Sequence, residues 1–181
     1  MAAEPSPILA LVYRGDRDAA LTLAAGCTLD LFEAAALGDA ERVRAILDAD
    51  ATAARTRAPD GFSALGLAAF FGQAACARLL IDAGAPVDEP AANAMRVTPL
   101  HSAAAAGHVE IARWLLERGA SVDARQQGGY TALHAAAQNG DLPLVELLLA
   151  HGADRALRSD DGKSAADFAS DPNVRARVRE S

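Results

Sequence analysis

The sequence contains two segments of one pattern whose starts lie 33 residues apart: TPLHSAAAAGHVEIARWLLERGA from Thr98 and TALHAAAQNGDLPLVELLLAHGA from Thr131. The pattern also begins at Ser63, 35 residues before Thr98, and a shortened form begins at Ser164, 33 residues after Thr131. A weaker copy opens at Leu29. A period near 33 residues predicts a solenoid, because one unit cannot bury its apolar face alone and stacked units share a core.

Each unit reads as two short helices followed by an extended loop. Thr98 is suited to cap the first helix, since its hydroxyl can accept a free backbone N–H, and Pro99 follows where a missing donor costs nothing. Gly107 ends this helix, and a second one carries apolar residues such as Ile111 at helical spacing until Gly119. The polar, glycine-containing stretch that follows predicts a hairpin-like loop.

The segments TPLHSAAAAGH…LLERGA, TALHAAAQNGD…LLLAHGA and SALGLAAFFGQ…LLIDAGA closely resemble the ankyrin repeat. The resemblance implies an all-α ankyrin-repeat solenoid of stacked antiparallel helix pairs with projecting β-hairpin loops and a concave face. We expect about five repeats, with repeats in residues 29–163 and a degenerate capping helix pair in residues 1–28. Residues 164–181 are expected to form a truncated capping repeat, whose second helix is replaced by a brief Asp-Pro start with Val174 and Val178.

The chain departs from the family pattern at several positions. Asp50 stands where the family has a helix-ending glycine, and Gly66 stands where the other units have His101 and His134. The resemblance implies that this histidine braces the adjacent hairpin by hydrogen bonding. The hairpin PVDEPAANAMRV is two residues longer than the next one, and its insertion is either a specificity element or neutral drift.

Composition and charge narrow the function classes. The net charge of −7 disfavours nucleic acid as a partner, because the surface repels phosphate. The two cysteines are too few for a disulfide framework and fit a reducing compartment. No apolar run approaches the roughly 20 residues of a membrane span, and the N-terminus lacks a basic secretory start. We therefore expect a cytoplasmic protein with no membrane partner; its Ala-rich, Arg-over-Lys composition favours a bacterial source.

No catalytic constellation stands apart from the repeat. His101 and His134 occupy one repeat position, and Cys76 aligns with core residues of the other units. Neither an acid–base pair nor a phosphate-cradling glycine loop is recognisable. We expect no catalytic residue, metal or cofactor, and a non-enzymatic module that binds another protein as a monomer, either as an adaptor or as a regulatory subunit. The alternative is a small-molecule-binding or enzymatic protein with an unrecognised pocket.

In the family that this chain resembles, partners are bound mostly by hairpin tips and by the inner-helix surface. The candidate partner-binding residues at the matching positions are Arg57, Asp60, Phe62, Phe71, Met95, Arg96, Arg125, Gln127, Tyr130, Gln138, Asn139 and Arg158. Of the adjacent Phe70 and Phe71, one is expected to pack under the neighbouring repeat and the other to be an exposed anchor.

Four of the units begin with a Ser or Thr, at Ser63, Thr98, Thr131 and Ser164. An arginine stands six residues before three of these starts, at Arg57, Arg125 and Arg158. One interpretation is that these arginines form a basic stripe, which binds an acidic segment of a partner through the planar guanidinium groups. The other is that each arginine pairs with a nearby hairpin aspartate, namely Asp60, Asp160 or Asp161. Exposed pairs of that kind stabilise little.

Overall fold

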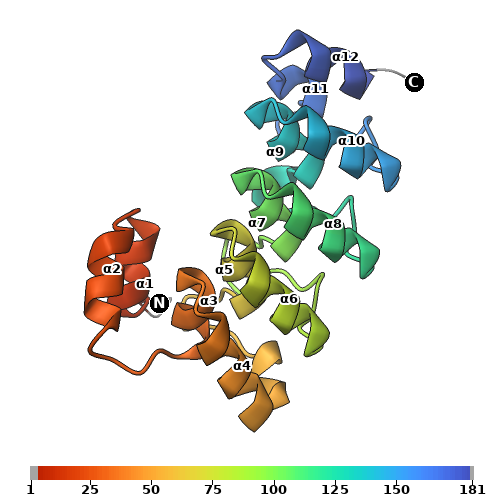
Figure 1. Cartoon of the computed structure of the whole chain (residues 1–181). Helices are drawn as coiled ribbons and strands as arrows, with labels where there is room; N and C mark the ends of the chain where they lie inside the picture. The colour runs from red at the N-terminus through yellow and green to blue at the C-terminus, as the bar shows by residue number, and fades with distance from the viewer. Residues whose placement is uncertain (1–3, 180–181) are drawn as a thin grey trace.

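The computed structural model describes residues 4–179 and shows a helical solenoid. Helix pairs stack one on the next from the N-terminal to the C-terminal end, as Figure 1 shows. Within the described residues there is no β-strand, and two of the hairpins are closed by isolated bridges, Arg57–Ser63 and Arg158–Ser164. The all-α solenoid expected from the repeat is therefore confirmed.

Five inner helices alternate with five outer helices along the stack. The inner helices are α3 (Leu31–Leu37), α5 (Ala64–Phe70), α7 (Pro99–Ala106), α9 (Ala132–Asn139) and α11 (Ala165–Phe168). The outer helices are α4 (Ala40–Ala49), α6 (Ala74–Asp82), α8 (Val109–Glu117), α10 (Leu142–Ala150) and α12 (Pro172–Arg179). An N-terminal pair, α1 (Pro7–Tyr13) and α2 (Arg17–Ala24), precedes them, and two short 3-10 helices, η1 (Ala51–Arg55) and η2 (Gln127–Gly129), lie in the loops.

Alanine lets the inner helices approach closely. Ala103 and Ala104 of α7 and Ala136 and Ala137 of α9 are fully buried between neighbouring repeats. Leucines of the outer helices complete one continuous core, and Cys76 lies in it as a small apolar residue, as its repeat position predicted. The Ala-rich composition thus serves the close stacking of short helices.

The third residue of most inner helices folds back onto the residue that caps the helix. The Thr98 backbone N–H donates to His101 Nδ1 at 3.3 Å, and the Thr131 N–H donates to His134 Nδ1 at 3.2 Å. These capping boxes satisfy donors that a helix start would otherwise leave free. In the end repeats a carboxylate accepts instead, from Asp30 N–H to Glu33 and from Ser164 N–H to Asp167.

Two of these side chains also reach the next hairpin. With Nδ1 accepting, the His101 Nε2–H donates to the Tyr130 carbonyl at 3.2 Å, and His134 Nε2–H donates to the Lys163 carbonyl at 3.1 Å. Both imidazoles are buried, at 3% and 2% exposed. The hairpin-bracing role implied for this histidine is confirmed.

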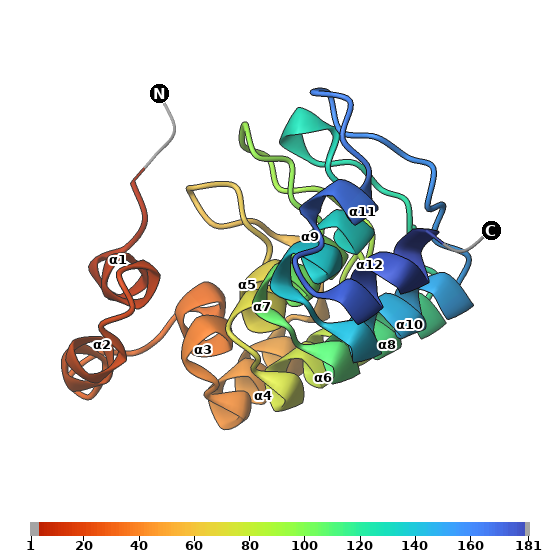
Figure 2. The ribbon, with the colours of Figure 1, turned by 90° about the horizontal axis from the view of Figure 1, so that it is seen from above.

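The hairpins are joined to one another by backbone hydrogen bonds. Ala92 N–H donates to the Gly61 carbonyl at 2.9 Å, Gln127 N–H to the Met95 carbonyl at 3.0 Å, and Asp160 N–H to the Gly128 carbonyl at 2.8 Å. Figure 2 shows the loops projecting side by side to one side of the helices. This ladder holds the hairpin edge of the concave face in place.

The first and last units differ from the sequence expectation in two details. The first inner helix is capped by Asp30, so the repeat begins one residue after the mark expected at Leu29. At the other end α12 is a helix of eight residues with Val174 and Val178 buried against its neighbours. The prediction that the second helix of this unit is replaced was wrong, because Asp171 starts a normal helix by accepting the Val174 N–H at 3.0 Å.

The N-terminal helices pack on the end of the stack. Helix α1 contacts α3, and α2 packs on α1. The Arg17 guanidinium donates to the Leu37 carbonyl at 2.6 Å, which ties the start of α2 to the end of α3. None of the helices in residues 4–179 has the length and apolar content needed to cross a membrane.

The buried histidines predict a pH dependence of stability. Burial lowers the pKa of His101 and His134 below the ordinary value, so below about pH 6.5 the unfolded chain binds more protons than the folded one. Stability should therefore fall as the pH decreases from about 7 to about 5.5. The double variant His101→Gln/His134→Gln keeps a side chain suited to a capping box and should lose less over this range. Urea unfolding at several pH values measures this, and equal slopes would contradict the prediction.

Candidate functional site

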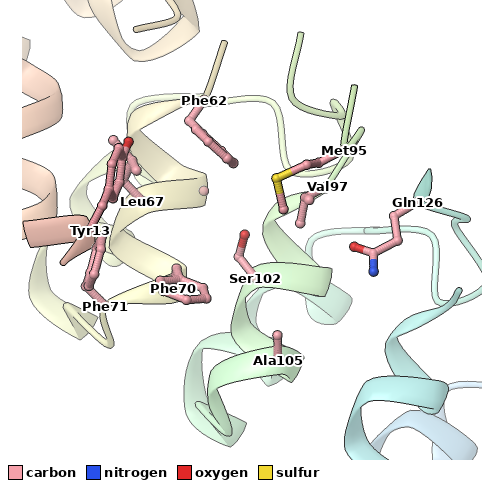
Figure 3. A pocket seen from close by; sticks show the side chains of 11 residues that line it. Tyr13, Phe62, Leu67, Phe70, Phe71, Met95, Val97, Ser102, Ala105 and Gln126 are labelled. Atoms are coloured by element: carbon pink, nitrogen blue, oxygen red, sulfur yellow. The ribbon is translucent and has the colours of Figure 1, made fainter. Parts of the chain in front are cut away.

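Exposed apolar side chains gather at one place on the concave side. Of the large hydrophobic residues that are exposed, Tyr13, Phe70 and Met95 are 39%, 48% and 52% exposed, and all three line one pocket. This α5–α7 pocket has a volume of about 380 Å³ and is shown in Figure 3. Its lining residues are Tyr13, Phe62, Gly66, Leu67, Phe70, Phe71, Met95, Val97, Ser102, Ala105 and Gln126.

The aromatic wall of the pocket is built from three elements. Tyr13 ends α1, Phe70 and Phe71 stand at the end of α5, and Phe62 lies in the preceding hairpin. The Tyr13 ring stacks on Phe71 with centroids 6.2 Å apart and planes 19° apart, while Phe70 and Phe71 meet edge to face at 5.1 Å. Because the rings support one another, the wall is held in place without a bound partner.

A hydrogen bond fixes Tyr13 at this wall. Its hydroxyl donates to Asp60 Oδ2 at 2.7 Å, which links α1 to the first hairpin. Burial, and then the Asp60 carboxylate, raise the pKa of Tyr13 well above the ordinary value, so the phenol stays neutral. Asp60, a predicted partner-binding residue, is thus engaged in holding α1, and its own carbonyl accepts from the Asn93 side chain at 3.0 Å.

The pocket exists because two positions carry small side chains. At the corresponding junction of α9 and α11, Tyr130, His134 and Phe168 form a cluster with ring centroids 5.5 to 5.9 Å apart. Their counterparts at the junction of α5 and α7 are Phe62, Gly66 and Ser102. The imidazole and the second ring are absent there, so the space that aromatic side chains fill at the α9–α11 junction is open at the α5–α7 junction.

Of the two adjacent phenylalanines, Phe70 is the exposed one. Phe71 is half-buried because it packs between Tyr13 and Phe70, whereas Phe70 projects at the rim of the pocket. One ring is therefore packed and one is exposed, as expected for the pair. Phe71, the candidate partner-binding residue of the two, is the packed ring, because Tyr13 of α1 covers it.

A smaller polar cleft adjoins the pocket. Its lining residues are Arg96, Arg125, Gln126, Gln127, Gly128, Gly129 and Asp160, and Gln126 lines both cavities. Arg96 adopts a left-handed backbone, with φ of 51°, at the tip of the long hairpin. Its side chain is exposed and makes no hydrogen bond or ion pair with any residue in 4–179. Arg96 stands at the position of Gly61, Gly129 and Gly162 in the other hairpins, and there it presents a cation that is unpaired within residues 4–179.

The three stripe arginines hold the hairpins together. Arg57 donates to the Pro90 carbonyl at 2.6 Å and pairs with Glu89, rather than with Asp60. Arg125 donates to the Arg158 carbonyl at 2.8 Å and pairs with Asp160 at 3.3 Å. The Arg158 guanidinium donates to the Gly162 carbonyl at 2.9 Å within its own hairpin. Of the four predicted arginines, only Arg96 is without a partner among the described residues.

The remaining predicted residues are spread along the concave side. Tyr130 is half-buried against Phe168, and Asn139 donates to the Ala105 carbonyl at 2.9 Å, so both contribute to packing between repeats. Gln127 and Gln138 are exposed. The structure brings Phe62, Phe71 and Met95 together in the pocket and places Arg96, Arg125 and Gln127 beside it.

Sequence reasoning missed Tyr13 and the role of Gly66. Tyr13 lies 47 residues before its partner Asp60 in a segment with only a weak echo of the repeat, so no pattern placed it on the concave side. Gly66 was noted as a departure from the repeat, and asking what space a missing imidazole leaves would have located the pocket. Within residues 4–179, no group of three or more His, Cys, Asp or Glu side chains is placed to hold a metal ion.

Comparison with known families agrees with this architecture. A family model for ankyrin repeats in three copies matches residues 31–126, and a second, for many copies, matches residues 115–169. The chain belongs to the ankyrin repeat family.

Three similar proteins share about half of this chain each. Ankyrin repeat and KH domain-containing protein 1 of Homo sapiens is 39% identical over 94 residues, 52% of this chain and 4% of that protein. Protein phosphatase 1 regulatory subunit 27 of Mus musculus is 35% identical over 92 residues, 51% of this chain and 58% of that protein. Ankyrin repeat and SAM domain-containing protein 6 of Rattus norvegicus is 35% identical over 103 residues, which are 57% of this chain and 12% of that protein. The chain thus spans less than two thirds of each relative.

The variant Gly66→His should stabilise the protein and fill the pocket. A histidine there can close the capping box with Ser63 and reach the Val97 carbonyl, as His101 and His134 do for their hairpins. Removing a helical glycine and adding these bonds should raise the free energy of unfolding by about 1 kcal/mol. Urea unfolding measures the change, with Gly66→Ala as the control that adds only a Cβ, 3.2 Å from Ser63 Oγ. A less stable Gly66→His protein would show that the cavity is not shaped for an imidazole.

Proposed function

We propose that the chain is a non-catalytic protein–protein interaction module that binds its partner through the concave hairpin and inner-helix face. The observation that carries the proposal is the grouping of the exposed side chains of Tyr13, Phe70 and Met95 around one pocket on that side. Exposed apolar side chains that gather rather than scatter mark interaction sites. Three further predicted residues, Arg96, Arg125 and Gln127, line the adjoining cleft.

Within this class, the proposal includes an adaptor and a regulatory subunit. The relative named protein phosphatase 1 regulatory subunit 27 supports the second version, although this chain covers 58% of that protein. The proposed partner is a protein rather than nucleic acid, because the chain carries a net charge of −7. We further propose that the chain acts in the cytoplasm as a monomer without a cofactor, and sedimentation at several concentrations would test the oligomeric state.

The concave face can be tested without damaging the fold. Met95, Gln127 and Gln138 are exposed, and their side chains make no hydrogen bond within the described part of the chain. The triple variant Met95→Ser/Gln127→Ala/Gln138→Ala should therefore stay folded but lose at least about tenfold in partner capture, because hot-spot truncation commonly costs more than 1.4 kcal/mol. The measurement is a pull-down from native lysate with mass-spectrometric identification.

A matched control carries Arg113→Ala and Glu117→Ala on the exposed side of the outer helix α8. The control should capture the same protein as the unchanged chain. If the control loses the partner and the concave variant keeps it, binding is on the convex side.

The competing function is small-molecule binding by the pocket. A rise in melting temperature with one metabolite, together with no captured protein, would favour it.

A further inference from the structure

We propose that the α5–α7 pocket receives one bulky apolar side chain from an extended segment of the partner, and that Arg96 binds a carboxylate of the same segment. The inference rests on the proposed function and specifies the chemistry of its partner. It departs from the interpretation of a basic stripe along three hairpins, because Arg96 is the one of the four predicted arginines that has no partner within residues 4–179.

The pocket has the size and surface of an anchor site. Its volume of about 380 Å³ lies within the roughly 300–1,000 Å³ of typical binding pockets. Figure 3 shows the Phe62 and Met95 side chains on one side of the space and Phe70 and Ser102 on another, with Gln126 at one edge. Rings and a thioether favour an apolar occupant, and methionine adapts its shape to different ones.

The charge beside the pocket identifies the second feature of the segment. Gln126 lines both the pocket and the polar cleft, so the two cavities adjoin. In that cleft Arg125 and Asp160 already pair with each other, at 3.3 Å, whereas the Arg96 guanidinium has no partner in the described part of the chain. A guanidinium holds a carboxylate with two parallel hydrogen bonds, so an acidic side chain near the apolar anchor complements this site.

The α9–α11 junction shows which side chains can fill a space equivalent to the pocket. At the α9–α11 junction the imidazole of His134 and the ring of Phe168 occupy the equivalent space. Gly66→His restores the first of these side chains, while Gly66→Ala leaves most of the space. Ala105 is exposed on α7 and lines the pocket, so Ala105→Trp obstructs it from outside the core and serves as a second variant should Gly66→His fail to fold.

The probe is a phage-displayed library of random dodecapeptides, selected on the intact chain. The enriched peptides should share one Phe, Leu, Ile or Met and an Asp or Glu near it. The best peptide, made with a fluorophore, is then titrated by anisotropy. Its Kd should rise at least about tenfold with Gly66→His or Ala105→Trp and change less than about twofold with Gly66→Ala. Arg96→Gln should raise the Kd about fivefold and reduce its dependence on salt.

Several outcomes would overturn the proposal. A library that yields no peptide above background, or peptides that bind Gly66→His and Ala105→Trp as well as the unchanged chain, would remove the anchor site. Peptides without an acidic residue, unaffected by Arg96→Gln, would remove the carboxylate partner. Dimerisation of the unchanged chain that disappears in Gly66→His would show that a second copy occupies the pocket instead.

The same variants separate this inference from the proposed function. If the partner captured from lysate is lost with the Met95/Gln127/Gln138 triple variant but kept with Gly66→His and Ala105→Trp, the concave face binds and the pocket does not. If neither set of variants affects capture, both proposals fail.

Discussion

The architecture depends on a short polar contact at the start of four of the five inner helices described, α3, α7, α9 and α11. An isolated helix of seven or eight residues is marginal in water, and α3, α5, α7 and α9 are no longer than that. The side chain at the third position satisfies the cap, and the imidazoles of His101 and His134 also bind the following hairpin. One buried side chain thereby fixes the helix start and the loop of the next repeat together, which is why the repeats keep a common geometry.

The candidate site lies where this contact is missing. Without an imidazole at Gly66, the hairpins before α5 and α7 are joined by the Arg57 guanidinium on the Pro90 carbonyl and by the Asn93 amide on the Asp60 carbonyl. These contacts lie at the hairpins and leave the space above α5 open. Proteins break their local rules most often at functional sites and compensate elsewhere. The second repeat breaks the rule at Gly66, while its hairpin keeps the arginine contact that Arg125 also makes in a repeat with an imidazole.

Much of the fold was readable from the sequence, because the repeat determines the helices, their caps and the hairpin-bracing histidines. The last helix was not predicted, because Asp171 and Pro172 replace the usual start of the outer helix. Asp171 nevertheless caps this helix in the ordinary way. The candidate site was predicted from the sequence only in part. Periodicity placed Phe62, Met95 and Arg96 on the concave side, but it compares equivalent positions and says nothing of contacts outside the repeat. Tyr13, and with it the ring that packs on Phe71, lies outside that comparison.

The docking of α1 has a consequence for affinity. One wall of the pocket is supplied by Tyr13, which reaches it from the terminal helix pair through its bond to Asp60. In a stack where each unit contacts only its neighbours, terminal units open most often. A ligand of the pocket would bind fully only those molecules in which α1 is in place, so its apparent affinity scales with that fraction. Fraying at the end of the solenoid and occupancy of the pocket are therefore thermodynamically linked, each shifting the other by the same free energy.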